Sequence, residues 1–75
     1  QNIECFPVPA TKSLTIRLEL MDDKLFIYNA IGEKIDELNL NKGTNELDLQ
    51  NYSNGMYFFQ FINTGITRKI SVKAD

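Results

Sequence analysis

The fold is decided by Asn51-Tyr52-Ser53-Asn54-Gly55-Met56-Tyr57-Phe58-Phe59-Gln60-Phe61, where a turn leads into the most aromatic part of the chain. The turn is rich in asparagine, serine and glycine, which bond their own backbone or accept left-handed conformations. From Met56 the side chains alternate with the period of a β-strand. One face carries Tyr57, Phe59 and Phe61, and the other carries Met56, Phe58 and Ile62. Because both faces are largely apolar, we expect this strand to lie inside a sheet.

The composition predicts one globular domain that spans residues 1–75. Hydrophobic residues make up 43% of the chain and charged residues 24%, which argues against disorder. The net charge of −2 disfavours nucleic acid as a partner, because phosphate binding needs a basic surface. No apolar run approaches the roughly 18 residues of a transmembrane segment. Since the chain begins at Gln1 without a signal peptide, we expect a fragment of a larger protein.

Other short segments also have the alternation or apolar content of β-strands, and turn residues separate them. The clearest alternation runs from Leu14 to Leu20, and the segment 25–28 is apolar on both faces like a central strand. The spacing in 35–40 slips by one residue, which indicates a bulge or bend. The remaining strand segments are 3–6, 47–49 and a final segment near the C-terminus. In the final segment we expect Ile70 and Val72 to point inward. The residues expected to point outward or to lie on an edge are Arg68, Lys69, Ser71 and Lys73.

The connections between these segments have recognisable turn chemistry. Pro7-Val8-Pro9-Ala10 must be a kinked connection, because proline has no backbone donor for a sheet. The polar segment 21–24 is expected to be a hairpin turn, and Gly32 provides a positive φ for the turn 29–34. We expect a further turn at 41–45 and a three-residue hairpin connection with a bulge at 63–65.

These features predict an all-β protein, an immunoglobulin-like antiparallel β-sandwich of about seven strands. The position of Tyr57 after a tight turn fits the tyrosine corner of such sandwiches, in which the phenol bonds to upstream backbone. Gly55 and Tyr57 are therefore the predicted structural motif.

The sequence contains no recognisable catalytic, metal or cofactor motif, so we expect neither an enzyme nor a cofactor. The chain has no histidine, the commonest general base. The carboxylates fall in predicted turns or on polar strand faces, and the pair Asp22-Asp23 lacks the further ligands of a calcium site. Cys5 is the only cysteine and is expected to be a small buried hydrophobe. Four aromatic residues could pack in the core or form a sugar-stacking platform, namely Tyr28, Tyr52, Tyr57 and Phe58.

The order of the motifs resembles the type A C-terminal sorting domain of proteins exported by the type IX (Por) secretion system of Bacteroidetes. The resemblance covers nearly the whole chain, and the order and spacing of its motifs carry it. The matching segments are Phe6-Pro7-Val8-Pro9-Ala10, Leu14-Thr15-Ile16, the segment 25–35, Gly43-Thr44-Asn45 with the strand after it, Ser53-Asn54-Gly55-Met56-Tyr57-Phe58 and the basic-hydrophobic ending 68–73.

The resemblance implies a non-catalytic secretion signal fused to the C-terminus of a cargo protein. It implies passage through the periplasm, recognition by outer-membrane translocon components, and removal by a sortase-like surface peptidase upstream of Ile3. The cargo would reach the cell surface or the extracellular medium. The alternative is an immunoglobulin-like structural or carbohydrate-binding accessory module of a secreted enzyme.

Recognition is expected at a few exposed residues of an edge strand and two turns. The final strand is the first candidate, because an edge strand can pair with a strand of a partner or of another copy. The oligomeric state is left open. The candidate recognition residues are Arg68, Lys69 and Lys73 of the final strand, Gly32 and Lys34 of the turn, and Pro7 and Pro9 of the kink.

Overall fold

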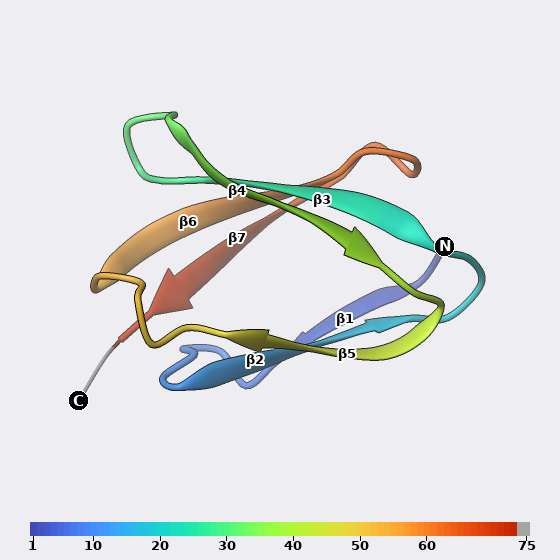
Figure 1. Cartoon of the computed structure of the whole chain (residues 1–75), viewed down its shortest axis with the longest axis horizontal. Helices are drawn as coiled ribbons and strands as arrows, with labels where there is room; N and C mark the ends of the chain where they lie inside the picture. Colours follow the sequence, from blue (N-terminus) through green and yellow to red (C-terminus); the bar gives the residue numbers. More distant parts are fainter. Residues whose placement is uncertain (74–75) are drawn as a thin grey trace.

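The computed structural model describes residues 1–73, which form seven strands and contain no helix. Two antiparallel sheets lie face to face, with the strand orders β1-β2-β5 and β4-β3-β6-β7 (Figure 1). This arrangement confirms the predicted all-β sandwich. The strands are β1 (Ile3–Phe6), β2 (Ser13–Leu18), β3 (Asp23–Tyr28), β4 (Lys34–Leu40), β5 (Gly43–Asp48), β6 (Gly55–Phe61) and β7 (Ile66–Val72).

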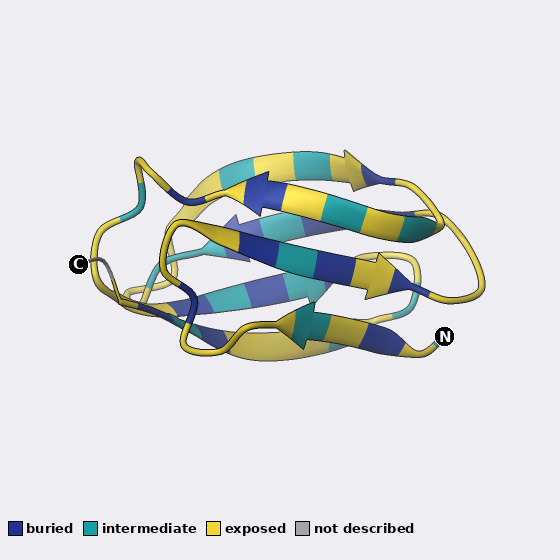
Figure 2. Ribbon diagram, turned by 90° about the horizontal axis from the view of Figure 1, so that it is seen from below, coloured by how far each residue is buried: buried dark blue, intermediate teal, exposed yellow. Residues whose placement is uncertain are grey.

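The core lies between the two sheets and follows the alternation of the sequence. Buried and more exposed residues alternate along the strands, as Figure 2 shows for the ribbon coloured by burial. Phe59 and Phe61 are fully buried, as predicted for the inner face of β6. Burial of large apolar side chains is the main favourable term in folding. The fully buried side chains that fill the centre are Phe59, Phe61, Leu14, Ile16, Leu18, Leu25, Ile27, Leu49 and Val72.

The turn before β6 has the geometry of a tyrosine corner. The hydroxyl of Tyr57 donates to the carbonyl oxygen of Ser53 at 2.7 Å, and Tyr57 is only 6% exposed. Gly55 opens the strand with φ +149°, a conformation that residues with a Cβ rarely adopt. No atom lies within 4 Å of an added Cβ there, so the backbone conformation and not space requires glycine. Both residues of the predicted structural motif therefore lie at this corner.

The turn between β3 and β4 accounts for the slipped spacing of the sequence. Gly32 has φ +88°, and the side-chain Oδ1 of Asn29 accepts hydrogen bonds from the backbone N–H groups of Ile31 and Glu33. The strand register jumps so that Ile27 pairs with Asp36 while Tyr28 pairs with Lys34. The residue between those partners, Ile35, is the bulged residue. The predicted bulge in this strand is confirmed.

The structure corrects the predicted connection between β2 and β3. Residues 21–24 are not a hairpin turn, because β2 and β3 belong to different sheets and the chain crosses between them. β2 ends at Leu18, and Leu20 is 65% exposed although the alternation had placed it inside. The strand stops there because Leu18 pairs with the first residues of both neighbouring strands, Ile3 and Gly43, so Leu20 has no strand partner. The side-chain oxygen of Gln1 accepts hydrogen bonds from the N–H groups of Leu20 and Met21 in the crossing segment.

The connection between β6 and β7 also differs from the prediction. Phe61 pairs directly with Ile66, so the hairpin loop is the four-residue segment 62–65 and contains no bulge. The N–H of Gly65 donates to the carbonyl oxygen of Phe61 at 2.8 Å and closes this longer loop. Ile62 therefore belongs to the loop, which a pattern of alternating side chains could not distinguish from the end of the strand.

Candidate functional site

The open edge of β7 is the first candidate surface. β7 pairs with β6 on one side and is the last strand of its sheet, as predicted. On the other side the only neighbour in the described part of the chain is Ala10, whose N–H donates to the oxygen of Ser71 at 2.9 Å and whose oxygen accepts from the N–H of Lys73 at 2.8 Å. Alternate residues of a strand direct their backbone groups to the same side. Thr67 and Lys69 therefore present their N–H and C=O groups along this free edge.

The kink 7–10 lies beside the end of β7, which brings two of the predicted recognition segments together. Ala10 forms an isolated parallel bridge with Val72 and is itself fully buried. Pro7 and Pro9 are exposed, and the peptide bond before each of them is cis. Lys73, which is exposed, is joined to this segment through its backbone. The kink thus marks where the free edge of β7 ends.

Arg68 is placed differently from the prediction. Neighbouring residues on a strand face opposite sides of the sheet, and Arg68 lies on the inner side with Ile70 and Val72. Its Nη2 donates to the backbone oxygen of Ile3 at 3.3 Å, so the guanidinium spans the flank between β7 and β1. The predicted cluster of Arg68 and Lys69 is therefore split between the two faces of the sheet.

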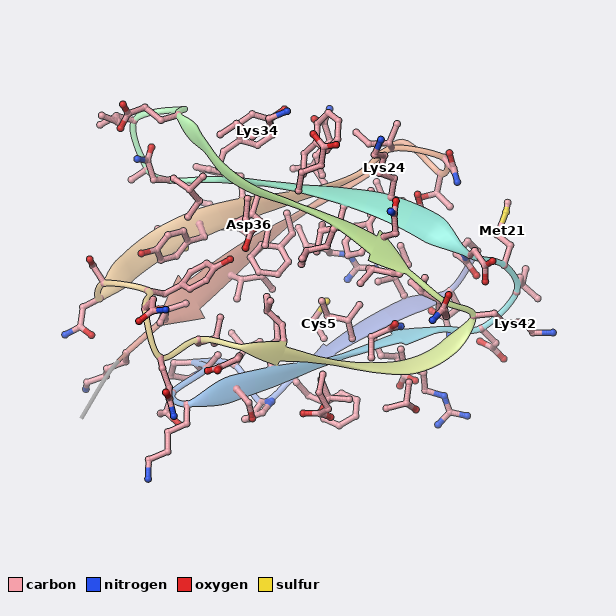
Figure 3. All side chains as sticks on the ribbon, viewed as in Figure 1. Cys5, Met21, Lys24, Lys34, Asp36 and Lys42 are labelled. Carbon is pink, nitrogen blue, oxygen red and sulfur yellow. The ribbon has the colours of Figure 1, made fainter. Side chains whose placement is uncertain are left out.

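Cys5 lies on the inner side of β1 at this same flank (Figure 3). The side chain packs against the core but is only half-buried, whereas a buried hydrophobe was predicted. Burial raises the pKa of its thiol, and the nearby charge of Arg68 partly lowers it again. A thiol with a raised pKa is less reactive than an exposed one.

Lys34 and Lys69 lie in one row across the outer face of the four-stranded sheet. The strand registers align Lys34 with Tyr28, Tyr28 with Phe58, and Phe58 with Lys69. The two lysines therefore stand at opposite ends of an aromatic pair. Gly32 lies just beyond this row in the β3–β4 turn, beside Ile31, which is 80% exposed.

A small charge network covers the next aromatic residue on this face. The carboxylate of Glu37 accepts from Lys34 Nζ at 2.8 Å and lies 3.4 Å from Lys24 Nζ. The bond raises the pKa of Lys34 and lowers the pKa of Glu37. Both ammonium groups lie over the ring of Phe26, at 4.3 Å for Lys34 and 5.9 Å for Lys24. Figure 3 shows Lys24 and Lys34 pointing away from the opposite sheet, whereas Asp36 points toward it.

The proposed aromatic platform does not form a single surface. Tyr28 and Phe58 are neighbours on the outer face, but Tyr57 is buried in the core and Tyr52 packs against it with ring centres 5.3 Å apart. The hydroxyl of Tyr52 donates to Asp36 Oδ2 at 3.0 Å. Burial, and next this hydrogen bond, raise the pKa of Tyr52 far above that of a free tyrosine. Tyr52 and Tyr57 thus pack in or against the core between the sheets and are not part of the outer surface that Tyr28 and Phe58 form.

Asp23 is an important residue, although the polar sequence around it predicts a solvated turn. It is 3% exposed, and its Oδ1 accepts from the N–H groups of Lys24 at 2.7 Å and Asn63 at 2.8 Å. Its Oδ2 accepts from the hydroxyl of Thr64 at 3.1 Å. The carboxylate thereby fixes the β6–β7 loop to the start of β3. No local signal reveals this role, because the loop residues that Asp23 holds, Asn63 and Thr64, lie about 40 positions away.

The carboxylates of the acidic pair Asp22-Asp23 accept hydrogen bonds from other parts of the chain. The Oδ1 of Asp22 accepts from the N–H of Lys42 at 2.6 Å, whereas the oxygens of Asp23 are occupied by the loop. Residues 1–73 contain no group of three or more side chains of the kinds that ligate metals. They also include no helix that is long and apolar enough to cross a membrane.

Comparison with known families gives the assignment. The family described as the secretion system C-terminal sorting domain matches residues 4–73, which is almost the whole chain. The chain belongs to this family, whose domains are C-terminal sorting signals for type IX secretion. The match confirms the resemblance and supports the secretion signal over the accessory module. The family is generally non-catalytic, and membership implies export out of the cell. A comparison with curated proteins finds no match.

Proposed function

We propose that this domain is the last element of a longer exported protein and that outer-membrane translocon components recognise it after passage through the periplasm. A sortase-like surface peptidase then removes the domain upstream of Ile3. The cargo is left at the cell surface or in the medium. Family membership supports export, which is the step that the other parts of this proposal depend on.

One observation carries the choice of the recognition surface, namely the free edge of β7. Thr67 and Lys69 offer an unpaired row of backbone donors and acceptors, and the kink with Pro7 and Pro9 ends that row. A strand of the receptor can add to such an edge through main-chain hydrogen bonds, and nearby side chains then provide specificity. Arg68 and Lys73 flank the edge, and Arg68 also holds it against β1. The same edge would allow two copies to associate.

The test is the export of a reporter fused to residues 1–75 in a bacterium that has a type IX system. Thr67→Pro removes an N–H that points to the open edge, so the sheet keeps its internal hydrogen bonds. The matched control is Thr44→Pro in β5, an edge strand of the other sheet. The N–H of Leu49, just after β5, donates to the carbonyl oxygen of Lys12, just before β2. Because backbone groups alternate sides along a strand, the odd-numbered residues of β5 face β2 and the N–H of Thr44 points away from it.

We expect Thr67→Pro to stop export while thermal unfolding shows a folded domain, and Thr44→Pro to leave export intact. Truncation before Arg68 should also stop export. Normal export of a folded Thr67→Pro variant would refute recognition at this edge. Failure of the unmodified fusion to leave the cell would refute the sorting function itself.

A further inference from the structure

The outer face of the four-stranded sheet carries a second surface that the edge of β7 does not explain. Its centre consists of three half-buried aromatic rings, Phe26, Tyr28 and Phe58. Met56 extends the apolar area along β6 and is 37% exposed. No other element of residues 1–73 covers this face, because the sandwich has only two layers (Figure 1).

Positive charge surrounds these rings. Lys24, Lys34 and Lys69 lie on this face, and Glu37 is the only acidic residue that the strands of residues 1–73 place there. Glu37 is shared by Lys24 and Lys34, and Lys69 has no ion pair in the described part of the chain. The face therefore has more ammonium groups than carboxylates to neutralise them.

The outer face of the opposite sheet has the reverse character. Glu4, Glu46 and Asp48 lie there with Arg17 as the single basic residue in the strands. The surplus of lysine on the other face is thus a property of that face and not of the chain, whose net charge is −2. Such asymmetry is the usual basis for orienting an approaching partner.

We propose that the outer face of β4-β3-β6-β7 is a second docking surface, and that its occupant is a protein surface with carboxylates around an apolar centre. This proposal rests on the sorting function, and it adds a second contact between the sorting domain and the protein that recognises it. Carboxylates of the partner pair with Lys24, Lys34 and Lys69, while its apolar centre covers Tyr28 and Phe58.

The geometry favours a protein over a membrane or a nucleic acid. Lys24 and Lys34 lie over the ring of Phe26, and Tyr28 and Phe58 are half-buried in the sheet face, so these rings suit coverage by a flat protein surface better than insertion into a bilayer. The acidic outer face of the other sheet and the negative net charge oppose a nucleic acid.

The test uses the same reporter fusion with a triple variant, Lys24→Gln with Lys34→Gln and Lys69→Gln. The matched control is Lys12→Gln with Arg17→Gln and Lys42→Gln, which removes the same charge from positions outside this face. Because charge complementarity acts on association, we expect export to slow by about tenfold in the first variant and by less than about twofold in the control. Thermal unfolding establishes that both variants are folded.

A photo-crosslinking amino acid at Phe58 identifies the occupant. We expect the crosslink to form with a receptor protein of the export machinery, at a segment that contains aspartate or glutamate. The crosslink should disappear in the triple lysine variant but remain in the control variant. Equal export of the triple variant and the unmodified fusion would overturn the proposal. So would lysine-dependent sedimentation of the purified domain with phosphatidylglycerol vesicles, which would assign the face to lipid. If the unmodified fusion is not exported, the sorting function fails instead.

Discussion

Tyr57→Phe tests the tyrosine corner most directly, because it removes one oxygen atom and keeps the buried ring. The hydroxyl of Tyr57 makes one hydrogen bond, at 2.7 Å, to the carbonyl oxygen of Ser53. That bond ties the β5–β6 connection to the start of β6, four residues later. The phenylalanine ring can still fill the core and contact Tyr52, so the packing energy is unchanged.

The expected loss follows from the position of the acceptor. A net protein hydrogen bond contributes about 1 kcal/mol, and an acceptor left buried without a partner costs more. Ser53 is an exposed residue, so water can reach its carbonyl oxygen and the larger cost does not apply. We therefore expect the free energy of unfolding to fall by about 1 kcal/mol, which for a domain of this size lowers Tm by about 4–8 °C.

The measurement is thermal and urea unfolding of the purified domain, followed by circular dichroism. Tyr28→Phe is the matched control, since its hydroxyl donates to Gln60 Oε1 at 3.1 Å on the outer face and joins two side chains of the same sheet. We expect that control to change stability by less than about 0.5 kcal/mol. Equal losses in the two variants would refute a special role for the corner. Failed export of Tyr57→Phe at an unchanged Tm would show that recognition reaches this turn.

Two further predictions concern residues that hold the sandwich at its other end and flank. Asp23→Ala should lower the free energy of unfolding by about 3 kcal/mol, because it removes a buried charged acceptor from three donors. The control Asp22→Ala, which removes one exposed hydrogen bond, should lower it by less than about 1 kcal/mol. Equal losses in urea titrations would contradict a special role of Asp23. Burial raises the pKa of Cys5, so its reaction with a disulfide reagent should begin at higher pH than that of a free thiol, and Arg68→Gln should move it higher still. Since the folded state holds the thiol proton more tightly, the free energy of unfolding should fall as pH rises past the ordinary cysteine pKa, and Cys5→Ala should abolish that fall. A Cys5 thiol that reacts at the same pH as free cysteine would contradict its burial.

Much of the fold could be predicted because it depends on local patterns. Alternation on the strands, the glycine at a positive φ in the β3–β4 turn, and the spacing between Gly55 and Tyr57 are all visible in neighbouring residues. The crossing between β2 and β3 could not be predicted, because a short polar segment reads equally as a hairpin turn or as a passage between sheets. The crossing follows from pairing partners far along the chain, because β2 pairs with β5 while β3 pairs with β4 and β6.

The candidate recognition surfaces were only partly visible in the sequence. The final strand was correctly placed at an edge, but Arg68 was grouped with Lys69 because they are adjacent in the chain. On a strand, adjacency means opposite faces, and the inner side of β7 directs Arg68 to the backbone oxygen of Ile3. The row that joins Lys34 to Lys69 depends on the registers of four strands, which no local pattern specifies.

The sequence by itself determined the all-β class, the apolar side chains that face the core, the tyrosine corner and the family. Each of these depends on residues close together in the chain or on the order of the motifs. Only the tertiary structure decided which segments became partners. It placed Ala10 against the end of β7, buried Asp23 beneath the β6–β7 loop and collected the lysines on one outer face. The physical reason is that these contacts join positions far apart in the chain, and their geometry is set by the packing of the two sheets.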